Sequence, residues 1–309
     1  MPTGERFFSD GAMADIVTLA ETRAGDLQPW PDYYRSKLRE YETVSRYFAR
    51  RDLGSVLEIG CGNGFTSYLL AARAHRTVAF DLPLRNTASH SAGVDAAGEF
   101  LRRVGSGNVS VVGGTAEELP FSDGSFDVVF SEYALQYIRE KDRALREVRR
   151  VLKPGGTFVA VVPNFMERVY APIGRLKYLA KRCITRAVHA NRRVDSCSTV
   201  RRKEGEPSPA RAWHEWLLLG PDGAYRSFRE ELMRHTPNSW RRLFERNGFI
   251  ITSMFSTELF PLGLFDMFGG TVRRYISKKT QAVNALFGGA PLIKRIGCSL
   301  CLISKKETA

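Results

Sequence analysis

The sequence has few cysteines and no long apolar segment. No run of 18 or more apolar residues occurs among its 309 residues, so no membrane-spanning helix is predicted. The first residues lack the basic and apolar stretches of a signal peptide. The five cysteines are scattered and odd in number, which argues against a disulfide framework, and Cys298 and Cys301 are interpreted as core residues. These absences predict a cytoplasmic protein without a metal site.

Two common phosphate-binding motifs are also missing from the glycine-rich segment 60–64. Glycine recurs there at every second position, and Phe65 stands where a G-x-G-x-x-G dinucleotide site has its third glycine. No G-x-x-x-x-G-K-[ST] sequence of a P-loop occurs. The glycines still indicate a sharp turn close to a ligand. Asp81, 21 residues after Gly60, is placed to accept hydrogen bonds from ribose hydroxyls. The pattern predicts a nucleoside cofactor, with a structural glycine turn as the alternative.

Apolar runs and helical segments alternate after residue 53. Apolar runs occupy residues 77–80, 109–112, 125–130 and 157–162, and a helical segment at 145–152 ends at Pro-Gly-Gly. Alternation of this kind predicts an α/β fold with a parallel sheet and helices on both faces. Ligands of such sheets bind beyond the carboxyl ends of the strands. The glycine segment and Asp81 are both expected at such ends.

The order of several motifs carries a family resemblance. Glu58 precedes the glycines, and A-E-E-L-P-F at 116–121, S-F-D-V-V at 125–129 and L-K-P-G-G-T-F at 152–158 follow. This series resembles the class I S-adenosylmethionine-dependent methyltransferases, closely over roughly residues 53–164. The resemblance implies a doubly wound, mostly parallel seven-stranded sheet whose last strand is antiparallel. It also implies S-adenosylmethionine as the cofactor. The chain departs from the family by a long insert, which its residues predict to be largely helical.

The resemblance also implies which residues hold the cofactor. The three glycines pass under its methionine part, Asp81 takes the ribose hydroxyls, and Ala116 and Glu117 flank the adenine. Many relatives carry aspartate where this chain has Thr115, so Thr115 or Glu117 would make the contact to the exocyclic amine. The predicted cofactor-binding residues are Glu58, Gly60, Cys61, Gly62, Asn63, Gly64, Asp81, Leu82, Thr115, Ala116, Glu117 and Ser131.

The predicted catalytic residues are Glu132, Tyr133 and His214. Glu132 and Tyr133 follow the fourth strand and should face the methyl group, where Glu132 could accept a proton and Tyr133 could pack on the methyl donor. His214 is the preferred base because histidine titrates in the useful range, and His235 is a second candidate. The segment around Glu132 is not an N-P-P-[YF] loop and no Pro-Cys motif occurs, which disfavours modification of nucleic-acid bases.

Four segments divide the chain. Residues 1–52 form a loosely packed lead-in and a cofactor-covering helix at 32–50, whose Tyr33, Tyr34 and Tyr41 are candidates to line the pocket, although packing is expected for at least two of them. Residues 53–164 form the cofactor-binding core. Residues 165–237 form a basic, mainly helical substrate lid. Residues 238–309 complete the sheet and carry an apolar and basic insertion at 255–297.

The excess positive charge of the chain is confined to its second half. Residues 1–164 hold 20 Lys and Arg against 21 Asp and Glu, whereas residues 165–309 hold 26 against 12. Such a basic surface attracts anions, although a merely solvated face is the alternative. The apolar run 260–268 lies near clustered cations, as in membrane-interface elements, but a pocket cap or a homo-oligomer interface is also open.

Together these patterns predict a methyltransferase for a small, amphiphilic or lipid-linked, anionic substrate, methylated at oxygen. Peripheral contact with anionic lipid would place the protein at the inner face of the membrane. An RNA methyltransferase is one alternative, disfavoured because the basic stretches lack interleaved aromatic residues for base stacking. A non-catalytic, cofactor-binding partner subunit is the other.

Overall fold

The computed structural model of the chain describes residues 10–27, 29, 33–46, 48, 52–83, 93–167, 224–258, 279, 290, 292–293 and 297–307. His214, most of the predicted lid and most of the 255–297 insertion lie outside this part. The division into four segments therefore stays a prediction. The elements, in chain order, are α1 (Asp10–Ala24), η1 (Gly25–Leu27), α2 (Tyr33–Ser45), β1 (Ser55–Ile59), α3 (Phe65–Ala71), β2 (Arg76–Asp81), α4 (Gly93–Val104), β3 (Val109–Gly113), β4 (Phe126–Glu132), η2 (Leu135–Tyr137), α5 (Lys141–Val151), β5 (Leu152–Pro163), α8 (Phe228–Arg234), α9 (Pro237–Arg246), β6 (Phe249–Glu258) and β7 (Ser299–Lys306).

The strands form one seven-stranded sheet in the order β3-β2-β1-β4-β5-β7-β6. Strands β1 to β5 pair in parallel, and β7 inserts between β5 and β6, antiparallel to both. The predicted doubly wound sheet is confirmed, including the antiparallel last strand, whereas most of the predicted helical insert lies outside the described residues. The strand order reverses at β1, where β2 lies on one side and β4 on the other, and a crevice for ligands opens at such a point.

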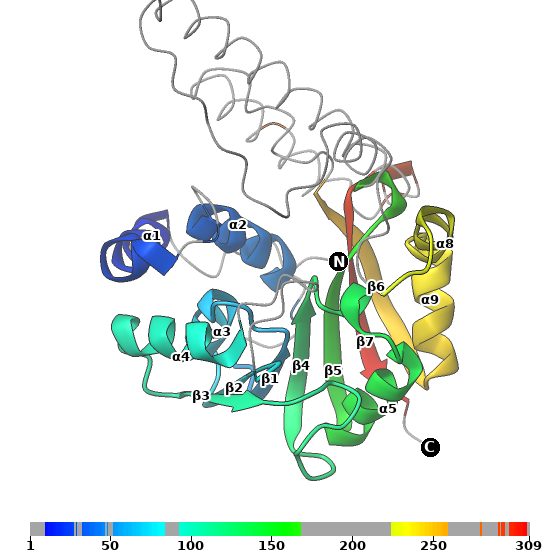
Figure 1. Cartoon of the computed structure of the whole chain (residues 1–309), viewed down its shortest axis with the longest axis horizontal. Helices are drawn as coiled ribbons and strands as arrows, with labels where there is room; N and C mark the ends of the chain where they lie inside the picture. Colours follow the sequence, from blue (N-terminus) through cyan, green and yellow to red (C-terminus); the bar gives the residue numbers. More distant parts are fainter. Residues whose placement is uncertain are drawn as a thin grey trace, which may run out of the picture.

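Helices cover both faces of the sheet (Figure 1). Helices α1 to α4 pack on one face, and α5 and α9 pack on the other. Helix α4 buries Ala97, Phe100, Leu101 and Val104, which recur at the i, i+3, i+4, i+7 spacing of one helical face. Burial of each large apolar side chain of this kind contributes about 1.5–3 kcal/mol. The sheet is therefore a rigid platform whose strand ends can position a site.

Two elements differ from the expectation. Residues predicted as a loose lead-in form α1, whose Val17, Ala20 and Ala24 are buried. Small side chains on one stripe pack closely without producing a strong amphipathic signal, which explains why the pattern missed this helix. Strand β5 starts at Leu152, directly after α5, rather than at Thr157. Its pairing with β4 shifts between Leu152 and Thr157, so the predicted Pro-Gly-Gly break is an irregularity within the strand.

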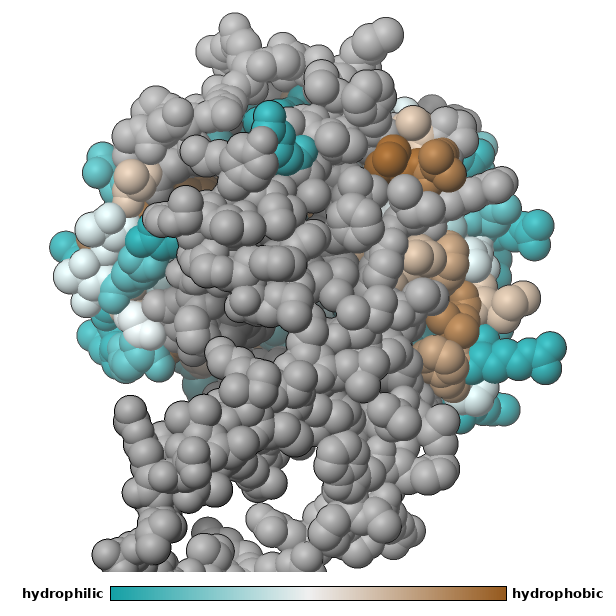
Figure 2. Space-filling model, turned by 90° about the horizontal axis from the view of Figure 1, so that it is seen from above, coloured by the Kyte–Doolittle hydropathy of each residue, from teal (hydrophilic) through white to brown (hydrophobic). Residues whose placement is uncertain are grey.

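The carboxyl ends of β1, β2, β4 and β5 meet at one edge, the upper one in Figure 1, with α2 beside it and α8 on the other side. Figure 2 views the molecule from above and shows mainly hydrophilic side chains on the flank of α1 and α4. On the opposite flank, hydrophobic side chains lie among the hydrophilic ones. Exposed large apolar side chains of the described residues include Met233 on α8 and Ile250 on β6. The flank that carries α8 is thus the more amphiphilic one.

Candidate functional site

The glycine loop joins β1 to α3 through backbone conformations that favour glycine. Gly60 and Gly62 have φ angles of 81° and 56°. A Cβ on Gly60 would lie 2.3 Å from the Cβ of Ala134, so packing excludes a side chain there. A Cβ on Gly62 would have no atom of the described residues within 4 Å. Gly60 is therefore required by the fold, whereas Gly62 borders open space through which a ligand can approach the backbone.

Asp81, the last residue of β2, ties its strand to this loop. Its Oδ2 accepts a hydrogen bond from Gly62 N at 2.8 Å, and its Oδ1 accepts one from Leu82 N at 2.7 Å. The carboxylate is 8% exposed. Charge-assisted bonds to backbone N–H groups are stronger than neutral ones and fix the orientation of a carboxylate. The loop and Asp81 therefore form one unit at the strand ends, while the bonds from ribose hydroxyls to Asp81 stay a prediction.

Asn63 and Ser131 leave buried polar atoms that suit a polar ligand. Asn63 Oδ1 accepts hydrogen bonds from Phe65 N at 3.2 Å and from the Tyr33 hydroxyl at 3.0 Å. Within the described part of the chain, Asn63 Nδ2 and Ser131 Oγ are buried without a hydrogen-bond partner. An unsatisfied buried group costs about 1–3 kcal/mol. Ligand groups that paired with these atoms would remove that cost, so the residues present fit a polar cofactor.

Glu58 is a buried carboxyl group directly in front of the glycines. Its side chain, 1% exposed, accepts a hydrogen bond from the Ser67 hydroxyl on α3. Burial raises the pKa of Glu58 to about 8, and the neighbouring Glu132 and Asp81 add to the rise. The Ser67 bond and the Lys37 ammonium oppose it. The bond between Glu58 and Ser67 thus links β1 to α3, on the two sides of the glycine loop. The Glu58 carboxyl group is half-ionised only near pH 8.

Glu132 is held on both of its oxygens. Lys37 Nζ, on α2, lies 3.1 Å from Oε1, and the Thr66 hydroxyl donates to Oε2 at 3.0 Å. Burial alone would lower the pKa of Lys37, but the Glu132 and Glu40 carboxylates outweigh it and raise that pKa above its usual value. This arrangement favours a role for Glu132 in anchoring α2 to β4 over the predicted role of proton acceptor.

Three carboxyl groups and one ammonium thus lie at the ends of β1, β2 and β4. Asp81 and Glu132 make the edge negative, Glu58 adds to that charge only as the pH approaches 8, and Lys37 neutralises only part of it. Opposite charges attract more strongly at such partly buried positions than in water. The edge therefore suits a cationic ligand.

Tyr133 follows β4 in a strained backbone conformation. Its φ of 51° is the one positive value among the described non-glycine residues. Its N–H donates to Val161 O at 2.9 Å, and Lys37 Nζ lies 5.0 Å from the centre of its ring. A left-handed conformation costs a non-glycine residue about 1–2 kcal/mol, and such residues cluster at functional sites. Because of this conformation, the Tyr133 side chain points in a different direction from the one it would have if β4 continued.

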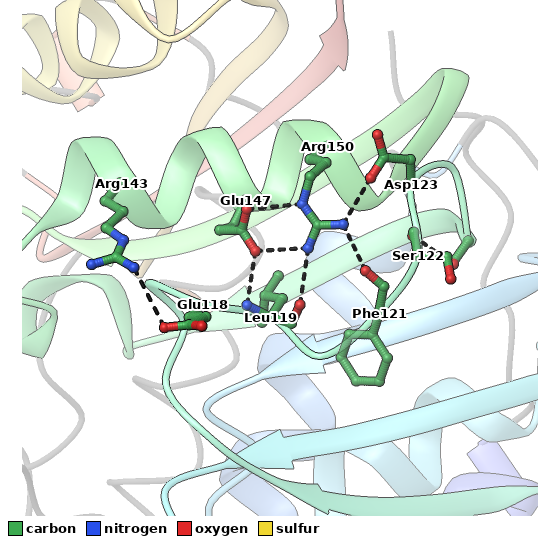
Figure 3. A network of polar contacts seen from close by, with 9 residues as sticks. Glu118, Leu119, Phe121, Ser122, Asp123, Arg143, Glu147 and Arg150 are labelled. Atoms are coloured by element: carbon green, nitrogen blue, oxygen red, sulfur yellow. Dashed lines mark hydrogen bonds and ion pairs between the residues drawn. The ribbon is translucent and has the colours of Figure 1, made fainter.

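The loop after β3 is fastened to α5 by an ionic network (Figure 3). Arg150 donates to Leu119 O at 2.9 Å and Phe121 O at 2.6 Å, and it pairs with Glu147 and Asp123. Glu147 Oε2 also accepts from Leu119 N at 2.8 Å. The hydrogen bonds of Arg150 lower the pKa of Glu147. This network positions the predicted adenine loop, which Gly114 N links to Asp81 O at 2.9 Å.

The structure brings most predicted residues to the same edge. The glycine loop, Asp81, Leu82, Ser131, Glu132 and Tyr133 follow β1, β2 or β4, and exposed Thr115, buried Ala116 and half-buried Glu117 follow β3. Of the three tyrosines, Tyr33 bonds to Asn63, whereas Tyr34 donates to Ala24 O and Tyr41 packs in the core. Sequence reasoning missed Lys37, Thr66, Glu147 and Arg150. A lysine on an amphipathic helix gives no signal of its buried partner.

A doubly wound sheet with a glycine loop and an acidic residue at the next strand end defines a protein that binds a nucleoside cofactor. Residues 57–160 match the family model described as a methyltransferase domain. This segment belongs to the class I S-adenosylmethionine-dependent methyltransferases, and the cofactor of that family is S-adenosylmethionine.

The relatives match over part of their length. An uncharacterized methyltransferase, YcgJ, from Bacillus subtilis is 36% identical over 106 residues, which cover 34% of this chain and 39% of the relative. The ubiquinone/menaquinone biosynthesis C-methyltransferase UbiE from Haemophilus ducreyi is 40% identical over 25% of this chain and 29% of its own length. The chain thus spans less than half the length of these relatives.

A solved structure shows the same fold. The geranyl diphosphate C-methyltransferase from Streptomyces coelicolor, with 13% sequence identity, covers 96% of this chain and 85% of its own with a TM-score of 0.51. Within the described residues, no helix has the length and apolar character needed to span a membrane.

Proposed function

We propose that the protein transfers a methyl group from S-adenosylmethionine to a hydroxyl oxygen of a small, amphiphilic or lipid-linked, anionic acceptor. The observation that carries methyl transfer is the unit formed by the glycine loop and Asp81 beside an acidic strand edge, within a segment that matches the methyltransferase domain. A cofactor with a sulfonium and an ammonium group is cationic at both centres and therefore suits this edge.

The residues of the site have separate roles in this proposal. The bound cofactor supplies an activated methyl group. Gly62 leaves room for it, Asp81 accepts hydrogen bonds from its ribose hydroxyls, and Asn63 and Ser131 offer their buried polar atoms. Helix α2, anchored by Lys37, excludes water from the edge. Displacement at the methyl carbon needs an acceptor placed within about 3–3.5 Å.

Two observations support the acceptor class. The excess positive charge lies wholly in residues 165–309, whose apolar run 260–268 is followed by paired basic residues. Anionic, amphiphilic molecules match both features. The name of the UbiE relative points to quinone biosynthesis and to carbon as the methylated atom. Methylation at carbon of such an amphiphile is therefore the second candidate function.

Calorimetry with S-adenosylmethionine tests cofactor binding. Asp81→Asn is expected to weaken the affinity by roughly tenfold to a hundredfold, because hydrogen bonds to a charged group contribute about 1.5–3 kcal/mol each. Asp95→Asn, an exposed substitution on α4, serves as the matched control. Unchanged affinity in Asp81→Asn would remove the ribose role, and no binding by the wild type would overturn the function.

Labelled cofactor tests the acceptor. The protein is incubated with cell extract and methyl-labelled S-adenosylmethionine, and the products are partitioned between organic solvent and water. Label in the organic phase supports an amphiphilic acceptor, whereas label in RNA overturns it. Co-sedimentation with vesicles of anionic lipid at low salt tests the membrane contact separately. Protein that stays in the supernatant would remove that contact.

A further inference from the structure

A second polar cluster, formed by Tyr225, Glu231 and His235, lies on the face of the sheet opposite α2. His235 follows α8 and is 1% exposed, and Glu231 on the same helix is fully buried. The Tyr225 hydroxyl lies 3.0 Å from His235 Nε2. Glu231 Oε1 lies 3.9 Å from His235 Nδ1. The imidazole therefore has a phenol at one nitrogen and a carboxyl group at the other.

Backbone contacts hold this cluster over the end of β5. Phe165 N, two residues beyond the end of β5, donates to His235 O at 2.9 Å. Trp240 on α9 donates from Nε1 to Pro163 O at 3.0 Å, and its ring stacks on the imidazole at 5.9 Å with an angle of 19° between planes. The imidazole is thus fixed in orientation at the edge where the cofactor loop also ends.

Tyr225 is fastened to the end of β4. Ala224 N donates to Gln136 O at 3.2 Å, within η2, which begins three residues after β4 ends. Lys141 Nζ lies 4.6 Å from the centre of the half-buried Tyr225 ring. Burial lowers the pKa of Lys141 to about 8, and Arg234 adds to the fall. A cation over the ring stabilises negative charge that develops on the phenol oxygen.

We infer that Tyr225, His235 and Glu231 form a proton relay that deprotonates the hydroxyl of the acceptor. This inference rests on the proposed methyl transfer to oxygen. The acceptor O–H bond breaks and its proton moves to the Tyr225 oxygen, while the Tyr225 proton moves to His235 Nε2. The acceptor oxygen forms its new bond to the methyl carbon as the bond from that carbon to sulfur breaks. Glu231 stabilises the resulting imidazolium.

Packing alone explains this arrangement less well. A neutral histidine stacked on tryptophan needs only hydrogen-bond partners, which backbone groups can supply. A fully buried carboxyl group beside Nδ1 carries a desolvation cost of several kcal/mol when ionised. At 3.9 Å from Nδ1 the Glu231 carboxylate acts on the imidazole through its charge, which stabilises the protonated form and offsets part of that cost during proton transfer. Tyr225 is the catalytic residue here, and His235 and Glu231 act through it.

Nuclear magnetic resonance tests the relay without cofactor. The Cε1–H signal of His235, assigned by its loss in His235→Gln, is titrated in the wild type, Tyr225→Phe and Glu231→Gln. Among the described residues, the groups that face the relay include Glu231 on α8, Tyr225 before it and Lys141 on α5 with Arg234 near it, while α9 presents uncharged Trp240. Glu231→Gln is expected to shift the titration to lower pH because it removes a negative charge. An unmoved signal in both variants overturns the relay.

The labelled-cofactor assay supplies the kinetic test. Tyr225→Phe, which removes only a hydroxyl, is expected to lower kcat on the order of 10²–10⁴-fold, the usual contribution of general acid–base catalysis. The affinity for S-adenosylmethionine, measured by calorimetry, is expected to stay the same. Glu231→Gln should move the acidic limb of the kcat profile to lower pH. Tyr68→Phe, on the opposite face of the sheet, is the matched control.

Two results would overturn the relay in distinguishable ways. A Tyr225→Phe variant as active as the wild type leaves methyl transfer intact and removes the relay alone. A wild-type protein that binds no cofactor and transfers no label removes the proposed function and the relay together. Tyr225→Phe and Glu231→Gln keep the shapes of the side chains, so the kinetic test does not depend on whether His235→Gln folds.

Discussion

Glu58→Gln should make the protein more stable at neutral and basic pH. Glu58 is buried at the end of β1, and its pKa in the folded protein is about 8 instead of 4.5. A raised carboxyl pKa means that the folded state favours the protonated form. The stability that this preference provides is fully present below pH 4.5 and is lost as the pH rises through 8. Glutamine resembles the protonated carboxyl group and carries no such penalty.

The size of the effect follows from the two pKa values. One pKa unit corresponds to about 1.4 kcal/mol, so the wild type loses roughly 1.4 kcal/mol per pH unit between 4.5 and 8. The full penalty is on the order of 4–5 kcal/mol. Because Glu58 is 1% exposed, solvent screens little of it. This penalty is a large part of the usual stability of a domain, about 5–15 kcal/mol.

Urea denaturation of the wild type and Glu58→Gln at pH 5, 6, 7 and 8 measures the effect. The difference in unfolding free energy at each pH cancels the contributions of every other titrating group that the substitution leaves alone. That difference is expected to grow in favour of Glu58→Gln with rising pH. For Glu118→Gln, at an exposed position in the loop after β3, the difference should stay flat.

Parallel stability curves for the wild type and Glu58→Gln would refute this reasoning. They would mean that Glu58 is ionised throughout, and the acidic edge would then be more negative than described. The same carboxyl group predicts proton release on cofactor binding, because a cation favours its ionised form. Calorimetry at pH 7 in two buffers of different ionisation enthalpy should detect this release in the wild type and less of it in Glu58→Gln.

Three further predictions concern the loop, the ion pair and the network on α5. Gly60→Ala should destabilise the fold severely because its Cβ would clash with Ala134, whereas Gly62→Ala, next to open space, should cost about 1 kcal/mol and mainly weaken cofactor binding. Equal melting temperatures of the two variants would contradict this. Lys37→Met should cost about 3–5 kcal/mol because it leaves a buried carboxylate unpaired, and adding Glu132→Gln should recover most of that loss in urea melts. Arg150→Met should speed hydrogen exchange at Leu119 N without changing exchange in β4, and equal exchange would show that the network does not hold the loop.

The sheet could be predicted because its signals are local. Buried strands of a parallel sheet are short apolar runs, and their ends carry glycine or acidic residues that a single sequence displays. The distance from Gly60 to Asp81 reflects one strand, one helix and the next strand, and the structure places both residues at one edge. Helix α1 was not predicted because its buried face consists largely of small residues, which give a weak amphipathic pattern.

Site residues could be predicted where a residue type at a strand end has one usual role. They could not be predicted where two partners come from elements far apart in the sequence and meet only in the folded chain. Glu132 was identified as a proton acceptor from its position after β4. Its two partners, Lys37 and Thr66, come from α2 and α3, which no spacing along the chain relates to β4. The Arg150 network was not predicted, because charged residues on an amphipathic helix usually face solvent and the sequence does not show which of them bond to a loop.

Glu132 and the relay divide two tasks that a single carboxylate cannot perform at once. A group that anchors α2 through Lys37 must stay ionised and bonded, whereas a base must release its partners to take a proton. Side chains alternate along a strand, so Glu132 faces α2 while Ser131, one residue earlier, faces the side of α5 and α8. The acceptor can therefore meet its base on the face opposite the anchor. If this division holds, Glu132→Gln should weaken cofactor retention more than it slows proton transfer, and Tyr225→Phe should do the reverse.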